Sequence, residues 1–323
     1  MPLPAVSIAL ATFNGASYLG QQLESFLTQT LRPAELVVVD DASTDGTRGI
    51  LQEFSRAAPF AVSIRTNETN AGPAAAFSQA AAACSGELVA FSDQDDVWAP
   101  EKLQRLAKRL AEEPTVGAVF CNADIVDANL RSTGRDVWSL VGLTGERRRQ
   151  VIAGDALTVL LKRYSVQGAT LLVRRSVLQS ALPIPTGWYY DAWIALVTAA
   201  EHQLAGVPEC LQKYRQHRAN VIGARSGALV EKLKAGLQAS RDAYLAAESA
   251  KYHALLDRLE SNGLAPDRAM VLVREKLAHL GRRISMPASR IARLPAVAAE
   301  VRRGGYRGYA TDWRSIALDL VGR

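Results

Sequence analysis

Residues 6–121 alternate short apolar runs with amphipathic stretches, and this alternation constrains the fold more strongly than any other feature of the chain. The apolar, β-rich runs lie at residues 6–11, 35–41, 60–65, 87–91 and 116–121. The segments between them place apolar side chains three or four positions apart, as amphipathic helices do. A strand and a helix about every 25 residues predict an α/β fold, doubly wound around a mostly parallel central sheet.

Polar side chains follow the predicted strands at their carboxyl ends, where sheets of this kind bind ligands. They are Asn14, Asp40, Asp41, Asn70, Asp93 and Asp95. Taken alone, the pair at 40–41 is better explained as a turn and helix cap. The second acidic cluster reverses that preference, because core packing does not explain carboxylates at two strand ends. We therefore expect Asp40 or Asp41 to accept hydrogen bonds from a nucleotide base or ribose.

The densest acidic cluster is the octapeptide Phe-Ser-Asp-Gln-Asp-Asp-Val-Trp at residues 91–98. Its carboxylates, Asp93, Asp95 and Asp96, repel one another, and each raises the pKa of the others unless a cation compensates. A divalent metal holding a diphosphate would compensate, because Mg²⁺ and Mn²⁺ prefer carboxylate and phosphate oxygens. The alternative is a solvated acidic turn before the helix that Pro100 begins.

Two later segments carry further candidate residues. Asp191 follows Trp188, Tyr189 and Tyr190, and partial desolvation by these rings would suit it to be a general base. It equally suits an N-cap of the helix predicted at 192–200, and both roles can hold together. In the polar stretch at 214–220, Arg215 and His217 could contact a diphosphate or a metal, although a lone histidine is more often structural.

Composition and charge limit the class of protein. The 323 residues are 48% hydrophobic and 22% charged, as in a globular protein with a full core. We expect no signal peptide and no spanning helix, because neither pattern occurs. Three scattered cysteines, Cys84, Cys121 and Cys210, favour reduced thiols and hence a cytoplasmic protein.

The chain divides into three predicted parts, residues 1–110, 111–224 and 225–323. The last holds 18 Lys/Arg against 10 Asp/Glu, whereas residues 1–224 hold 20 against 22. A leucine stripe from 229 to 259 predicts a helix that Asn262-Gly263 ends, and a second helix is predicted at 270–284. In the middle part, Gly168–Val173 is predicted to be a strand.

The basic part at 225–323 has two interpretations. It is either a peripheral contact with the anionic inner leaflet of a membrane or a solvated helical appendage or oligomer contact. Nucleic acid binding is not expected, since no recognition motif accompanies the charge.

Several of these motifs together resemble glycosyltransferase family 2, inverting enzymes of the GT-A fold that use nucleotide-sugars. The resemblance covers about residues 5–222 and rests on Ala11–Gly15, Val38–Thr47, Asn67–Gly72 and the D-x-D at 93–95. The octapeptide together with Tyr-Arg-Gln-His at 214–217 resembles the rhamnosyltransferase-like branch, which implies L-rhamnose from dTDP-rhamnose. A family member using a UDP-hexose, or a non-catalytic carbohydrate- or nucleotide-binding module of this fold, is the alternative.

The resemblance implies roles for the candidate residues in a metal-dependent transfer to a glycan or lipid-linked acceptor, as in cell-surface polysaccharide or O-antigen synthesis. Asp191 would be the catalytic base. Nucleotide-binding positions would be Ala11, Thr12, Asn14, Asp40, Asp41, Asn70, Asp93 and Arg215. Metal ligands for Mg²⁺ or Mn²⁺ would be Asp95, Asp93 and His217. Acceptor or sugar contacts would be Trp188, Tyr189 and Trp193, with core packing an equal account of Trp193.

The sequence departs from the pattern of the rhamnosyltransferase-like branch at one position and from that of processive synthases at another, and it argues against two other classes of protein. The branch commonly has His-Asp where this chain has Tyr190-Asp191, and no Arg-Trp pair of processive synthases occurs. A receiver-type phosphoacceptor is excluded because its lone phosphorylatable Asp is missing from the third strand. A nucleotidyltransferase is disfavoured because no basic residue lies in the loop after the first strand.

Overall fold

The computed structural model describes residues 2–217, 241–310 and 313–322. The chain forms two compact units. One, called the sheet unit, comprises residues 1–156 and 165–220, and the other, called the helical unit, comprises 157–164 and 221–323. The parts predicted at 1–110 and 111–224 contribute to one sheet, and a boundary between them stays a prediction.

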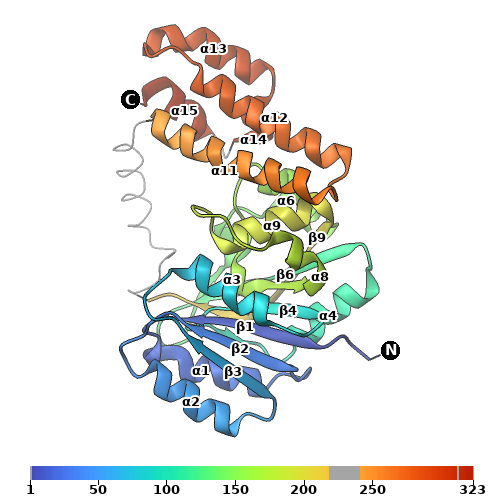
Figure 1. Cartoon of the computed structure of the whole chain (residues 1–323). Helices are drawn as coiled ribbons and strands as arrows, with labels where there is room; N and C mark the ends of the chain where they lie inside the picture. The colour runs from blue at the N-terminus through green and yellow to red at the C-terminus, as the bar shows by residue number, and fades with distance from the viewer. Residues whose placement is uncertain (1, 218–240, 311–312, 323) are drawn as a thin grey trace. The chain divides into compact units, whose positions relative to one another are not determined.

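The sheet unit alternates strands and helices along its first half, as Figure 1 shows. Its strands are β1 (Val6–Thr12), β2 (Glu35–Asp40), β3 (Ala61–Thr66), β4 (Leu88–Ser92), β5 (Val97–Trp98), β6 (Val116–Val126), β7 (Ser132–Asp136), β8 (Leu171–Arg174) and β9 (Gln203–Arg215). Its α-helices are α1 (Ala16–Leu27), α2 (Thr47–Ala57), α3 (Pro73–Ala83), α4 (Lys102–Glu112), α5 (Val137–Leu140), α6 (Gly145–Ile152), α8 (Arg175–Ala181) and α9 (Tyr190–Glu201).

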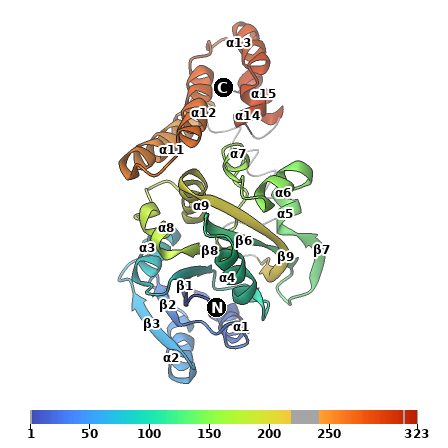
Figure 2. The ribbon, with the colours of Figure 1, turned by 90° about the vertical axis from the view of Figure 1, so that its right-hand side faces the viewer.

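The strands form one sheet in the order β3-β2-β1-β4-β8-β6-β9-β5, with β7 beside β6. β1, β2, β3 and β4 pair in parallel, β8 is antiparallel to both neighbours, and β6 runs parallel to β9 (Figure 2). The chain moves from β1 to β3 in one direction and returns past them to β4. Right-handed crossovers therefore put α1 and α2 on one face and α3 on the other (Figure 1). The strand order reverses between β1 and β4, and sheets of this kind bind ligands in the crevice expected at the carboxyl ends of such strands.

The core of the sheet unit explains why these segments are strands and helices. Leu and Val side chains of β1, β2 and β4 are fully buried, and α1 and α4 cover them with leucines at helical spacing. The strands and helices predicted in residues 6–121 are confirmed. β5 and β7 were not predicted, because two- and five-residue strands exist only through pairing with β9 and β6.

The strand predicted at Gly168–Val173 is partly wrong. Gly168–Thr170 forms a 3-10 turn, and only Leu171–Arg174 is strand β8. The reason is a close approach that sequence does not reveal, since a Cβ on Gly168 would lie 1.9 Å from the Tyr190 hydroxyl. The turn fits that ring and also donates a backbone hydrogen bond to Asp191.

The helical unit contains α7 (Leu157–Leu160), α11 (Arg241–Asn262), α12 (Asp267–Ile284), α13 (Arg290–Arg302), α14 (Gly305–Tyr309) and α15 (Trp313–Val321). The predicted helix end at Asn262 is confirmed, with Gly263 at a φ of 65° beyond it. The predicted start at 229 lies outside the described residues. Among the described residues, no helix is both long and apolar enough to span a membrane.

Candidate active site

The loop after β1 and the loop after β2 meet at residues with left-handed backbones. Asn14 has a φ of 48° and Ala42 a φ of 65°, conformations that residues other than glycine adopt at a cost. The Asn14 amide N–H donates to the Ser43 hydroxyl at 2.9 Å, and its side-chain oxygen accepts from the Thr44 N–H at 2.9 Å. These bonds offset the strain and hold the two loops together at the crevice.

Asp40 ends β2 and is fully buried. Its carboxylate accepts hydrogen bonds from the Thr12 hydroxyl at 2.9 Å, the Ser43 hydroxyl at 2.5 Å and the Arg48 Nε at 3.0 Å. Thr12 and Ala11 end the neighbouring strand β1. The predicted nucleotide-site residues of β1 and β2 therefore form one hydrogen-bonded edge.

Asp41 makes a different set of contacts. It accepts from the Asn67 side-chain amide at 2.7 Å and from the backbone N–H groups of Ala71 and Gly72 at 2.9 and 2.8 Å. These bonds close the loop between β3 and α3, on which Asn70 is exposed. Asp41 thus shapes the wall of the crevice that carries Asn70.

Gln94, the middle residue of the D-x-D, joins the ends of β1 and β4. Its side chain accepts from the Phe13 N–H at 2.8 Å and donates to the Phe13 carbonyl at 3.0 Å. Gly15 leaves room for it, since a Cβ there would lie 2.2 Å from the Gln94 side-chain oxygen. Gln94 therefore sets the position of the acidic loop against the β1 loop.

Asp93 lies where the carboxylates are most crowded. Burial raises its pKa to about 7, and the charges of Asp95 and Asp191 add to that shift. The Tyr190 hydroxyl donates to Asp93 at 3.5 Å. The structure thus brings Asp191, almost a hundred positions later in the sequence, to the D-x-D. Such a concentration of negative charge favours binding of a cation.

Asp95 contacts His217 directly, with the Asp95 Oδ2 and His217 Nε2 2.8 Å apart and both side chains mostly buried. Tyr18 of α1 supports this pair, because its ring lies 4.5 Å from the His217 ring. A carboxylate and an imidazole are both suitable ligands for Mn²⁺. Within residues 2–217, 241–310 and 313–322, no group of three or more His, Cys, Asp or Glu side chains forms a metal site by itself. An ion at Asp95 and His217 would take its other ligands from a diphosphate and water.

Arg215 is buried beneath the acidic loop. Its guanidinium donates to the backbone carbonyls of Asp95 and Ala128 at 2.7 Å and to the Gln21 side chain at 2.5 Å. It also lies 4.7 Å from the centre of the Tyr18 ring. These contacts favour a role for Arg215 in holding the loop that carries Asp95, and its predicted contact with a diphosphate stays a prediction.

A buried polar relay lies behind the acidic loop. Asp96 accepts from the Gln212 side chain at 3.0 Å and from the Arg215 N–H at 3.1 Å. Lys102 is fully buried, and its Nζ donates to the Gln212 side-chain oxygen and the Ala169 carbonyl, each at 2.6 Å. Burial raises the pKa of Asp96 well above its usual value and lowers that of Lys102 to about 8. The relay connects the D-x-D loop to the turn at 168–170.

Asp191 lies in the first turn of α9 and is 8% exposed. One carboxylate oxygen accepts from the Gly168 N–H at 3.0 Å and the other from its own neighbour, the Ala192 N–H, at 2.8 Å. Beside it, the Tyr190 ring stacks on Phe77 with centroids 3.9 Å apart. The carboxylate is therefore oriented by the backbone, one residue after the tyrosine that contacts Asp93.

The three aromatic residues predicted to contact sugar differ in exposure. Tyr189 is 54% exposed, Trp188 is 9% exposed and Trp193 is fully buried. The Trp193 indole N–H donates to the Ala181 carbonyl at 2.6 Å. This burial favours the core-packing account of Trp193, and Tyr189 is the ring best exposed for stacking.

Sequence reasoning did not identify the supporting residues Gln94, Lys102, Gln212 and Tyr18. The partners of Gln94 and of Lys102 lie 81 and up to 110 positions away. Only the octapeptide signalled any of them, since Gln94 stands between two of its carboxylates.

Comparison with known proteins agrees with this geometry. The sequence profile of the family described as Glycosyl transferase family 2 matches residues 7–178, more than half of the chain. TuaG of Bacillus subtilis, named for teichuronic acid biosynthesis, is 35% identical over 217 residues, 66% of this chain and 79% of TuaG. The chain belongs to glycosyltransferase family 2.

Other relatives match over a similar span of the chain. An uncharacterized glycosyltransferase of Nostoc sp., alr2836, is 32% identical over 222 residues, 67% of this chain. That match spans 66% of the Nostoc protein, just under two thirds of its length. WfgD of Escherichia coli, named as a UDP-Glc:α-D-GlcNAc-diphosphoundecaprenol β-1,3-glucosyltransferase, is 26% identical over 219 residues, 67% of this chain and 79% of WfgD. None of these names supports the rhamnosyltransferase branch.

Solved structures identify the fold. S. aureus TarS 1–349, solved with UDP-GlcNAc, has a TM-score of 0.58 at 16% identity and covers 92% of this chain and 81% of its own. The mannosyltransferase PcManGT from Pyrobaculum calidifontis, solved with GDP-Man and Mn²⁺, has a TM-score of 0.54 at 21% identity, covering 98% and 79%. The predicted GT-A fold, a mostly parallel α/β sheet with C-terminal helices, is confirmed.

Proposed function

We propose that this chain is an inverting glycosyltransferase that moves a sugar from a nucleoside diphosphate to a hydroxyl group of a glycan or lipid-linked saccharide. One observation carries the proposal. Asp191, held by two backbone N–H groups, directly follows Tyr190, whose hydroxyl donates to Asp93 of the D-x-D at 3.5 Å. A base oriented beside a diphosphate-binding loop is what single-displacement transfer requires.

The proposed reaction assigns each group one task. The β1 and β2 ends, with Asp40, Asp41, Asn14 and Asn70, bind the nucleoside. Asp191 accepts the proton of the acceptor hydroxyl as its oxygen attacks the anomeric carbon, and the bond to the diphosphate breaks on the opposite face. This general base catalysis contributes about 10²–10⁴-fold. Tyr189 stacks on a sugar ring at the mouth of the site.

Asp95 and His217, with Asp93 on the ribose or a bound water, would hold a Mn²⁺ or Mg²⁺ ion. Such an ion neutralises the charge that develops on the leaving diphosphate, an effect worth several kcal/mol. The carboxylate–imidazole pair at 2.8 Å supports this assignment. His217→Ala should raise the Mn²⁺ concentration needed for half-maximal turnover, whereas the same change at His253, exposed in the helical unit, should leave it unaltered.

The identity of the nucleotide-sugar donor is the most specific part of the proposal. The octapeptide suggested dTDP-rhamnose, whereas the name of WfgD includes UDP-Glc and a diphosphoundecaprenol-linked acceptor, and the name of TuaG includes a cell-wall polymer. We place a UDP-sugar first and keep dTDP-rhamnose as the second candidate, each with a role in cell-surface polysaccharide synthesis.

The test is turnover of the full chain with a panel of UDP-, dTDP- and GDP-sugars, Mn²⁺ or Mg²⁺ and a diphospholipid-linked saccharide. Asp191→Asn should lower transfer by about 10²–10⁴-fold without weakening donor binding. Asp136→Asn is the matched control, because Asp136 also accepts a backbone N–H, that of Ser139, at the end of β7. Normal turnover by Asp191→Asn, or a product that retains the anomeric configuration, would refute the mechanism. Donor binding by the wild-type chain without transfer would favour a non-catalytic module.

A further inference from the structure

Helix α13 of the helical unit has two different faces. Arg293, Val297 and Glu300 are buried at successive turns of one face. On the opposite face Ile291 is 81% exposed, Leu294 54% and Val301 48%. These positions follow the i, i+3, i+10 spacing of one helical stripe, and the exposed Pro295 and Ala298 extend it. We call Ile291, Leu294, Pro295, Ala298 and Val301 the apolar stripe.

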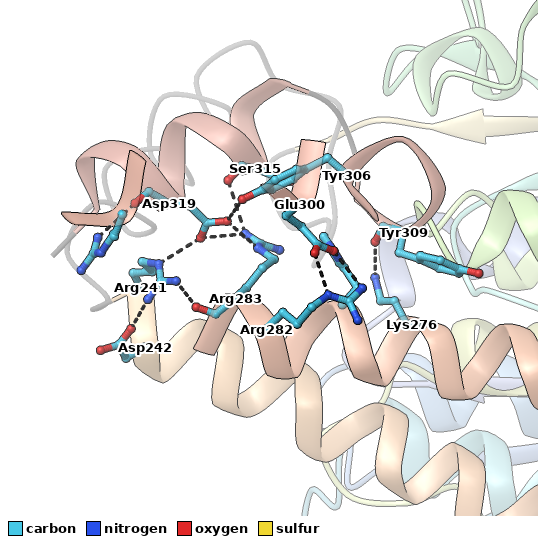
Figure 3. A network of polar contacts seen from close by, with 12 residues as sticks. Arg241, Asp242, Lys276, Arg282, Arg283, Glu300, Tyr306, Tyr309, Ser315 and Asp319 are labelled. Atoms are coloured by element: carbon cyan, nitrogen blue, oxygen red, sulfur yellow. Dashed lines mark hydrogen bonds and ion pairs between the residues drawn. The ribbon is translucent and has the colours of Figure 1, made fainter. Parts of the chain in front are cut away.

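The buried face fixes which way the stripe points. Glu300 accepts from the Arg282 Nε at 2.6 Å, as Figure 3 shows. It also contacts the His279 Nδ1 at 2.6 Å, and both contacts tie α13 to α12. The Arg293 guanidinium donates to the Asp319 and Gly322 carbonyls at 3.1 and 2.9 Å, which ties α13 to the end of α15. The apolar stripe is therefore a stable feature of this unit.

A second network of ion pairs and hydrogen bonds joins α15 to α11, α12 and α14. Asp319 accepts from the Arg241 Nε at 2.9 Å, the Arg283 Nε at 2.6 Å and the Tyr306 hydroxyl at 2.6 Å (Figure 3). With these bonds, helices α11, α12, α14 and α15 share one buried carboxylate. Glu300 and Asp319 are both buried among these cations, and Arg303 lies 3.9 Å from Glu300, so neither carboxylate is exposed beside the apolar stripe.

Positive charge surrounds the apolar stripe. Arg290 precedes it, Arg302 and Arg303 follow it, and all three are exposed. Between residues 286 and 310 the one acidic side chain is Glu300, and it is 1% exposed and already paired. The exposed side of α13 is thus apolar along its length and cationic at both ends.

We propose that the exposed face of α13 docks on an anionic lipid bilayer, with the apolar stripe at the acyl boundary and Arg290, Arg302 and Arg303 at the headgroups. Apolar side chains gain by leaving water, and long arginine side chains keep their charge among lipid phosphates. Nucleic acid would match the arginines but offers nothing to Ile291 or Leu294. A second copy of α13 would bring arginines of like charge together. The proposal deepens the proposed function, because it puts the enzyme at the surface where a lipid-linked acceptor lies.

The test is sedimentation of the full chain with vesicles of phosphatidylcholine alone and of phosphatidylcholine mixed with phosphatidylglycerol. We expect binding to the mixed vesicles that weakens at high salt. Ile291→Ser/Leu294→Ser should weaken it by at least about tenfold, and Arg290→Gln/Arg302→Gln by about 30-fold. Leu264→Ser/Val271→Ser is the matched control, since these side chains are 55% and 50% exposed outside the stripe, and it should bind as the wild type does.

Equal loss of binding in the stripe and control variants, or equal binding to both kinds of vesicle, would overturn the proposal. So would a dimer in solution that Ile291→Ser/Leu294→Ser converts to monomer while vesicle binding is unchanged, because the stripe would then join two copies. Thermal unfolding of each variant checks folding. Turnover with a water-soluble acceptor, measured in parallel, tests the proposed sugar transfer without any membrane. Loss of vesicle binding with normal turnover would therefore concern the docking proposal alone.

Discussion

Replacing the buried Lys102 by methionine should destabilise the sheet unit strongly. Methionine keeps most of the packing volume against Trp98 but removes the Nζ, which donates to Gln212 and Ala169 at 2.6 Å. Removing one partner of a buried charged network typically costs about 3–5 kcal/mol. Relief from burying the Lys102 charge, whose pKa is lowered to about 8, offsets part of this. We expect a loss of about 3 kcal/mol in the free energy of unfolding.

The measurement is urea unfolding of Lys102→Met and of Lys108→Met, the same change on the same helix. Lys108 is 63% exposed and pairs with Glu112 at 3.7 Å, so its loss should cost about 0.5 kcal/mol or less. For a unit of this size, 3 kcal/mol corresponds to a melting temperature lower by about 6–12 °C. If the two variants unfolded within 0.5 kcal/mol of each other, the relay would not stabilise the fold, and the argument would be wrong.

Three further outcomes test other parts of the structure. Gly168→Ala should cost about 1–3 kcal/mol and slow transfer, because its Cβ meets the rigid Tyr190 ring. In contrast, Gly20→Ala in open space on α1 should stabilise by about 0.5–1 kcal/mol in urea unfolding. Burial lowers the pKa of His279 to about 4, so the stability that the neutral ring contributes is complete above pH 6.5 and is lost as the unfolded chain takes up a proton. The free energy of unfolding should therefore fall by about 2 kcal/mol between pH 7.5 and 5. If His279→Gln lost as much stability over the same pH range, His279 would not be the cause.

Most of the first half of the fold could be predicted from sequence, because the signals are local. An apolar run such as 35–40 forms a strand that is buried on both faces, and the spacing of Leu19, Leu23 and Phe26 forms one face of a helix. The less periodic middle could not be predicted as well. At Gly168 the backbone conformation depends on a ring more than twenty positions away.

One part of the candidate site could likewise be predicted from the sequence, and another part could not. Parallel strands bring their carboxyl ends to one edge, so the sequence by itself predicted that Asp40, Asp93 and Asp95 would lie along the same edge of the sheet. The segment that carries Asp191 reaches Asp93 through the Tyr190 hydroxyl, and only the tertiary structure supplies that contact. A carboxylate 98 positions from Asp93 has no local signal that fixes its distance.

The octapeptide illustrates the physical reason most clearly. Its composition determined that a cluster of negative charge needs compensation, since like charges in a buried loop repel wherever they lie. Tertiary structure decided which carboxylate meets which partner. Asp95 faces His217, Asp96 turns inward to Gln212, and Asp93 faces Tyr190. The sequence determines which side chains are acidic. Which of them can bind a ligand and which support the loop depends on partners that the folded chain brings from more than ninety positions away.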